Sequence, residues 1–153
     1  MAIYAMGDLH FSGEPPTKPM EVFGAQWLGH REKVITYWKE TVKEEDTVLL
    51  VGDISWSMDL RDAVEKDLGP LAALPGELAI LKGNHDYWWG TATKMKKFFE
   101  AHGIESIDIL FNNCFFYGDY ALCGTRGWFY EEDAAGTHTG KMLAREALRL
   151  MGY

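Results

Sequence analysis

The chain has 153 residues, of which 47% are hydrophobic and 25% are charged, a composition typical of a globular domain. We therefore expect a single domain, residues 1–153, with a core of its own. The formal net charge of −8 argues against a protein that binds nucleic acid or an anionic membrane through a basic surface. An anionic substrate remains compatible, because bound divalent cations can reverse the local charge.

Signals of export and of membrane insertion are missing from the sequence. The first residues lack a basic region followed by an apolar stretch, and no apolar run approaches the roughly 18 residues of a membrane span. Cys114 and Cys123 form no CxxC pair and lie in apolar segments, so we expect two buried thiols in a reducing compartment. Together these features predict a cytoplasmic protein without a membrane partner.

Three apolar segments alternate with three amphipathic segments over the first hundred residues. Strands are predicted at 2–6, 47–51 and 77–81, and apolar periodicity predicts helices within 27–42, 60–71 and 95–99. Asp59 is a plausible N-cap of the second helix, and Gly103 is expected to end the third. Right-handed crossovers make the three strands parallel, so their carboxyl ends share one edge of an α/β sheet.

The pattern changes after residue 102. Short strands are predicted in 107–112, 114–117 and 120–124, and Gly118-Asp119 has the form of a two-residue hairpin turn. A loop is predicted over 125–140 and a helix over 141–151.

Each of the first three strands ends in glycine followed by a polar side chain. Gly7 precedes Asp8 and His10, Gly52 precedes Asp53, and Gly83 precedes the run Asn84, His85 and Asp86. Side chains two residues apart in an extended segment point the same way, so Asp8 and His10 can hold one metal ion. Asp53 and Asn84 can add ligands from neighbouring strand ends. This mixed donor set suits Mn²⁺, Fe²⁺ or Zn²⁺.

The segments GDLH, GDISW and GNHDYWW resemble the signature of the calcineurin-like metallophosphoesterase family. That signature is Asp-x-His, then Gly-Asp, then Gly-Asn-His-Asp/Glu, each after a strand. The phrase GTRGW at 124–128 resembles a bacterial branch of predicted phosphohydrolases. The resemblance implies a sandwich of β-sheets flanked by helices. It also implies a metal-dependent phosphoesterase that hydrolyses a phosphomonoester or phosphodiester with a hydroxide activated by two metal ions.

The resemblance also implies a role for each residue of the motifs. Asp8 and His10 would bind the first metal, Asp53 would bridge both metals, and Asn84 would bind the second. His85 would contact the phosphoryl or leaving-group oxygen as a general acid or electrostatic stabiliser.

Two further side chains complete the predicted site. Asp86 would orient His85, and Arg126 is a candidate contact to the phosphate of a small-molecule substrate.

The family completes its site with three further histidines that have no match here. After His85 only His102 and His138 remain, so we expect an incomplete second metal site and a chain that corresponds to the N-terminal portion of a longer family member. Apolar surface left uncovered by the absent portion would favour a homodimer. The alternative function is a non-catalytic metal-binding or interaction module that keeps only a half-site.

Several aromatic residues follow the motifs closely. Trp56, Trp88, Trp89 and Trp128 can pack beneath the loops or can form the floor of a pocket for an aromatic leaving group, and we favour packing. His30 lies among charged residues on the first predicted helix, so we expect it on the surface.

Overall fold

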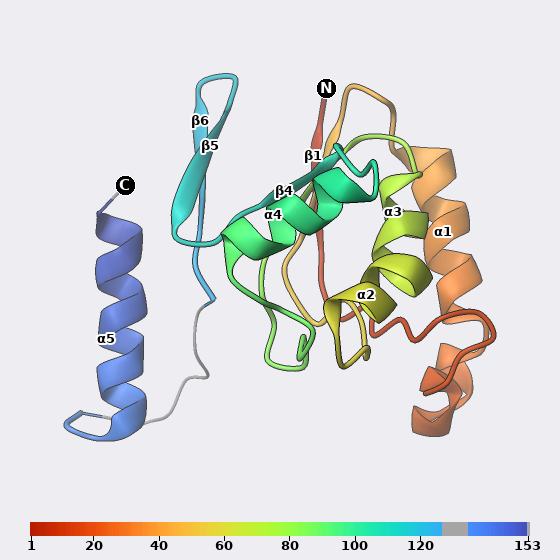
Figure 1. Cartoon of the computed structure of the whole chain (residues 1–153), viewed down its shortest axis with the longest axis horizontal. Helices are drawn as coiled ribbons and strands as arrows, with labels where there is room; N and C mark the ends of the chain where they lie inside the picture. Colours follow the sequence, from red (N-terminus) through yellow and green to blue (C-terminus); the bar gives the residue numbers. More distant parts are fainter. Residues whose placement is uncertain (127–134, 153) are drawn as a thin grey trace. The chain divides into compact units, whose positions relative to one another are not determined.

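The computed structural model describes residues 1–126 and 135–152, and the chain divides into two compact units, residues 1–109 and 110–153. The first unit contains a four-stranded parallel sheet in the order β1 (Ile3–Met6), β2 (Thr47–Leu50), β3 (Glu77–Ile80) and β4 (Ile107–Ile109) (Figure 1). The predicted α/β class and the three parallel strands are confirmed, and a fourth strand extends the sheet beyond β3.

Helical segments connect the strands. The β1–β2 connection holds two 3₁₀ turns, η1 (Met20–Phe23) and η2 (Ala25–Trp27), and helix α1 (His30–Thr41); α4 (Ala92–Ala101) joins β3 to β4. The β2–β3 connection is α2 (Leu60–Ala63), a π turn η3 (Val64–Leu68) and α3 (Gly69–Ala72). The predicted start of the second helix and the predicted end of the third are confirmed. The Asp59 carboxylate accepts from the Asp62 N–H, and Gly103 follows α4 with φ of 68°.

One face of the sheet forms the core of the first unit. Right-handed connections between strands in sequential order place all the connecting helices on the same face. Alternate strand residues are accordingly buried, together with apolar side chains of η3, α3 and α4: Val48, Leu50, Leu78, Ile80, Leu68, Leu71, Met95 and Phe99. On β2, residues of the opposite parity are less covered: Leu49 is half-buried and Val51, just after the strand, is 51% exposed.

A buried carboxylate on the π turn ties three segments together. Asp67 has no exposed surface. It accepts hydrogen bonds from the Gly13 N–H (3.0 Å), the Arg31 guanidinium (2.6 Å) and the Ser55 hydroxyl (2.6 Å). The π turn therefore braces the loop after β1, the first turn of α1 and the loop after β2.

The second unit consists of a β-hairpin and one helix. The hairpin strands β5 (Asn113–Tyr117) and β6 (Tyr120–Gly124) pair antiparallel across the predicted Gly118-Asp119 turn. Helix α5 (His138–Met151) begins three residues before the predicted start at Lys141, because the Thr137 side chain caps it by accepting from the Gly140 N–H. Residues 127–134 of the predicted loop lie outside the described residues.

The prediction of two buried thiols is wrong. Cys114 and Cys123 lie directly opposite each other in the hairpin and form a disulfide, with Cys114 half-buried and Cys123 exposed. Disulfides are rare in reducing compartments, so the cytoplasmic location stays a prediction that the cysteines no longer support. None of the helices in the described part of the chain is long and apolar enough to cross a bilayer.

We expect Asp67→Asn to lower the free energy of unfolding by about 3 kcal/mol or more, because it leaves the Arg31 guanidinium, whose side chain is only 11% exposed, without its counter-charge. Urea titration followed by circular dichroism measures the change. The matched control is Asp62→Asn, which removes an exposed pair with Lys66 on the same helical segment and should cost no more than about 0.5 kcal/mol. Equal effects of the two substitutions would refute the bracing role.

Candidate metal centre

The loops that follow β1, β2 and β3 meet at one end of the first unit, the lower end in Figure 1. Backbone hydrogen bonds continue beyond the strands: the N–H groups of Asp8, His10 and Phe11 donate to the carbonyls of Gly52, Asp53 and Ile54 at 3.1, 2.9 and 3.0 Å. The first loop is thereby fixed against the second, and the predicted convergence of these strand ends is confirmed.

Two glycines allow the second and third loops to touch. A Cβ atom on Gly52 would lie 2.6 Å from the Cα of Gly83, and a Cβ atom on Gly83 would overlap the backbone nitrogen and Oδ1 of Asp53. Any side chain at either position would push the loops apart. The glycines at the strand ends are therefore required by the close approach of the backbones.

Three residues of the predicted site adopt a left-handed backbone. Asp8, His10 and Asp53 have φ of 56°, 47° and 51°. This conformation costs a residue with a Cβ atom about 1–2 kcal/mol. Strain of this kind is characteristically concentrated at functional sites, where surrounding contacts hold it in place.

His10, Asp53 and His85 form a cluster that could hold a metal ion. One donor atom from each lies within 4.8 Å of the other two. Asp53 Oδ2 is 2.9 Å from His85 Nδ1 and 3.8 Å from His10 Nε2, and the Asp53 side chain is only 9% exposed. Asp8 extends the cluster from the solvent side, with its Oδ1 3.5 Å from His10 Nε2 and its side chain 75% exposed.

The donor set fits a divalent cation. The separations of His10 Nε2 from the two carboxylates are too long for good hydrogen bonds. They are close to the spacing of two donors that each bind one ion at about 2.0–2.2 Å. Among the described residues, His10 Nδ1 is also buried without a hydrogen-bond partner. His10 is thus placed beside two carboxylates without being satisfied by either.

Asp53 is held in its ionised form. Burial raises the pKa of its carboxyl group. Hydrogen bonds from the His85 N–H (2.8 Å) and ring, together with the nearby His10, outweigh this effect, so the pKa lies below its usual value. An ionised carboxylate next to two imidazoles is the charge arrangement that a metal ligand requires.

The Asp86 carboxylate was expected to orient the His85 ring. Its hydrogen bonds go instead to the backbone of the loops, which it holds together. Its side chain is 1% exposed and accepts from the N–H groups of Gly83 (2.8 Å), Asp53 (2.9 Å) and Ile54 (2.9 Å). The Ser55 N–H (3.3 Å) and the Trp88 indole (3.1 Å) also donate to it. Burial raises the pKa of Asp86 despite these donors. Asp86 therefore positions Asp53 and His85 through the backbone.

Asn84 lies beside the cluster, whereas Arg126 belongs to the other unit of the chain. Asn84 is exposed, and its Nδ2 lies 3.0 Å from His85 Nδ1, at the rim of the cluster. Arg126 belongs to the second unit, so its contact with substrate stays a prediction.

Two supporting residues were not foreseen in their roles. His30, which was expected on the surface, is half-buried, and its Nε2–H donates to the carbonyl of Leu9 (3.0 Å), between Asp8 and His10. Trp56 stacks on His10 with 4.7 Å between ring centroids. Trp88 is buried against Asp86, as the packing interpretation predicts, and Trp128 lies outside the described residues.

We expect Gly83→Ala to weaken Mn²⁺ binding about tenfold or more and to lower stability by about 1–3 kcal/mol, because the new methyl group would displace Asp53. Calorimetric Mn²⁺ titration and urea unfolding measure the two effects. Gly90→Ala is the control, since its Cβ atom would make ordinary contacts of 3.8 and 3.9 Å with Lys94 and Met95. Normal Mn²⁺ affinity in Gly83→Ala would show that the loop contact does not shape the cluster.

Comparison with known proteins supports the fold and the family of this chain. A crystal structure of AQ665, a protein of unknown function from Aquifex aeolicus, is similar in fold with a TM-score of 0.53 and 19% identity, over 97% of this chain and 74% of that chain. No curated protein matches the sequence significantly. The sequence profile of the calcineurin-like phosphoesterases matches residues 1–141, so the chain belongs to the calcineurin-like phosphoesterase family.

Proposed function

We propose that this chain is a metal-dependent phosphoesterase that hydrolyses a phosphomonoester or phosphodiester of a small molecule. The observation that carries the proposal is the His10–Asp53–His85 cluster at the carboxyl ends of parallel strands, in a chain of this family. Ligands of open parallel sheets bind at this edge. The cofactors would be two divalent ions, Mn²⁺, Fe²⁺ or Zn²⁺, which supply Lewis acidity and a hydroxide nucleophile when bound.

The residues of the cluster would divide the work of holding the ions. Asp8, His10 and Asp53 would hold the first ion. Asp53 and Asn84 would hold the second, after the Asn84 amide turns its oxygen inward. His102, in the described part of the first unit, does not add to these ligands, because its Nδ1 lies 2.8 Å from the Phe98 carbonyl at the end of α4. The proposed second ion therefore needs a further ligand, which a homodimer partner would be able to supply.

His85 would act on the substrate. Its Nδ1 lies 2.9 Å from the Asp53 carboxylate, and this contact favours the tautomer with the proton on Nδ1. The Nε2 atom lies 3.4 Å from Asn84 Nδ2, and it would contact the phosphoryl group or the leaving-group oxygen once the Asn84 amide turns toward the second ion. With the ring protonated, Nε2 would donate a proton to the departing alkoxide.

We expect Mn²⁺-dependent hydrolysis of an aryl phosphomonoester or phosphodiester, and we expect Asp53→Asn to abolish it, because a neutral amide cannot replace a bridging carboxylate. The measurement is the release of the aryl alcohol at saturating Mn²⁺. Circular dichroism must first show that Asp53→Asn keeps its fold.

The alternative function gives a different result in the same assay. A non-catalytic metal-binding module would bind Mn²⁺ in a calorimetric titration, would lose that binding in Asp53→Asn, and would hydrolyse neither ester above the rate of the variant. That outcome would refute the catalytic proposal and retain the half-site.

A further inference from the structure

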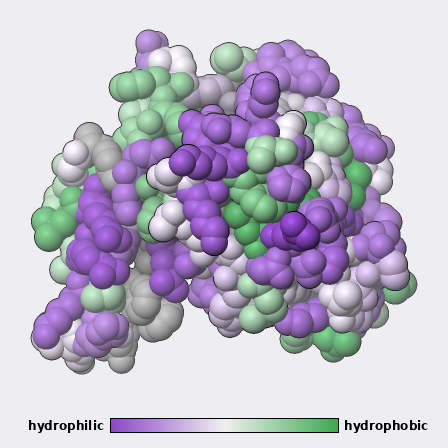
Figure 2. Space-filling view, viewed as in Figure 1, coloured by the Kyte–Doolittle hydropathy of each residue, from purple (hydrophilic) through white to green (hydrophobic). Residues whose placement is uncertain are grey.

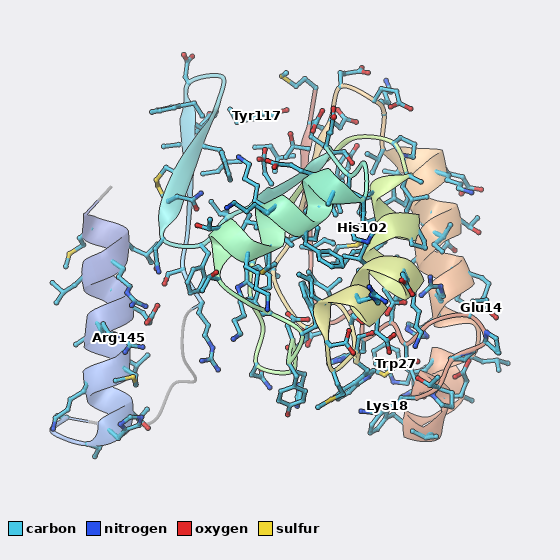
Figure 3. The ribbon with its side chains drawn as sticks, viewed as in Figure 1. Glu14, Lys18, Trp27, His102, Tyr117 and Arg145 are labelled. Atoms are coloured by element: carbon cyan, nitrogen blue, oxygen red, sulfur yellow. A yellow bond between two sulfur atoms is a disulfide. The ribbon has the colours of Figure 1, made fainter. Side chains whose placement is uncertain are left out.

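Lys18 lies next to Trp56, the aromatic residue that stacks on His10 of the metal centre. Lys18 lies in the loop between β1 and η1, at the same end of the first unit as the strand-end loops (Figure 3). Its Nζ is 5.0 Å from the ring centroid of Trp56. The Trp56 ring is stacked on His10 at 4.7 Å and lies 4.9 Å from the His85 ring. A single indole therefore touches the lysine and both histidines of the cluster.

The backbone of Lys18 is fixed. The buried Ser12 side chain bonds it twice: its hydroxyl oxygen accepts from the Lys18 N–H (3.1 Å) and its O–H donates to the Lys18 carbonyl (3.1 Å). The Thr17 N–H donates to the Ser12 carbonyl (3.0 Å). Gly13, which follows Ser12, donates its N–H to the Asp67 carboxylate. Lys18 therefore belongs to an ordered loop that is anchored to the core of the unit.

The ammonium group of Lys18 has no carboxylate partner in the described part of the protein. Lys18 is exposed, and none of the described carboxylates lies within ion-pair distance of it. The neighbouring cluster contributes the carboxylates of Asp8 and Asp53, in a chain with a net charge of −8. An unpaired ammonium group beside a cation-binding cluster is suited to an anion that bridges the two.

We propose that Lys18 is a substrate-binding residue whose ammonium group contacts a non-bridging oxygen of a phosphate held at the His10–Asp53–His85 cluster. A cation–π contact holds the ammonium group 5.0 Å from the centroid of the Trp56 ring, and that ring itself stacks on His10 of the cluster. The inference rests on the proposed function, because it needs a phosphate at the metal centre. It adds the loop after β1 to the substrate-binding surface.

The variants separate charge from structure. Lys18→Met keeps the length and the apolar stem of the side chain but removes the charge, whereas Lys18→Arg keeps the charge. Lys39→Met is the matched control, because it makes the same change of net charge at an exposed position in the last turn of α1. A structural role of the lysine would lower stability in Lys18→Met without a selective effect on phosphate.

The experiment is calorimetric titration of the Mn²⁺-loaded full chain with inorganic phosphate, preceded by Mn²⁺ titration of each variant. We expect Lys18→Met to weaken phosphate binding about five- to tenfold, with unchanged Mn²⁺ affinity. Lys18→Arg and Lys39→Met should stay within about twofold of the natural chain. Higher salt should weaken phosphate binding less in Lys18→Met than in the natural chain. In turnover, the same loss should fall on KM rather than on kcat.

The failures are distinguishable. Equal phosphate affinity in Lys18→Met and the natural chain would overturn the role of Lys18 and leave the phosphoesterase proposal intact. Mn²⁺ binding without any phosphate binding in the natural chain would also overturn it. A natural chain that binds no Mn²⁺ would overturn the proposed function, and the role of Lys18 with it.

Discussion

The candidate site depends on the hydrogen bonds that the buried Asp86 carboxylate accepts from two loops. It accepts from Gly83 in the third loop and from Asp53 and Ile54 in the second, so one side chain holds two strand ends in contact. The desolvation of a carboxylate is costly unless several donors surround it. Here those donors are the backbone groups that would otherwise be unsatisfied at the ends of the strands. The same hydrogen bonds therefore compensate the desolvation of the carboxylate and satisfy the backbone N–H groups at the strand ends.

This arrangement explains why strained residues are tolerated at the site. Asp53 has a left-handed backbone that is held by a hydrogen bond on each side. Its own N–H donates to the Asp86 carboxylate, and its own carbonyl accepts from the His10 N–H. The strain at His10 is held by the same bond to the Asp53 carbonyl. These bonds thereby hold the side chains of His10 and Asp53 close to each other, with His10 Nε2 3.8 Å from Asp53 Oδ2. Such preorganisation favours ion binding, because the ligands need not be gathered from separate loops.

The sequence predicted the convergence of the strand ends better than the contacts that support it. Periodicity and strand-end glycines were sufficient for the parallel strands and for the convergence of Asp8, His10 and Asp53, since these depend on local patterns and on connection handedness. The backbone role of Asp86 and the partial burial of His30 depend on tertiary contacts that no local pattern encodes. The disulfide did leave a signal, because Cys114 and Cys123 are equally distant from the predicted Gly118-Asp119 turn. Symmetric placement about a hairpin turn implies cross-strand neighbours.

A continuous buried network joins the bracing π turn to the metal centre. Ser55 donates its hydroxyl to Asp67 and its N–H to Asp86, so the two buried carboxylates share one residue. Asp67 in turn holds Gly13 of the loop that carries Lys18, and Arg31 of α1. The loop after β1 is therefore coupled to the cluster twice, once through this polar network and once through the contact of Lys18 with Trp56. Because fully satisfied buried networks rigidify what they connect, the spacing between Lys18 and the cluster is set by the core of the unit rather than by the surface loop alone.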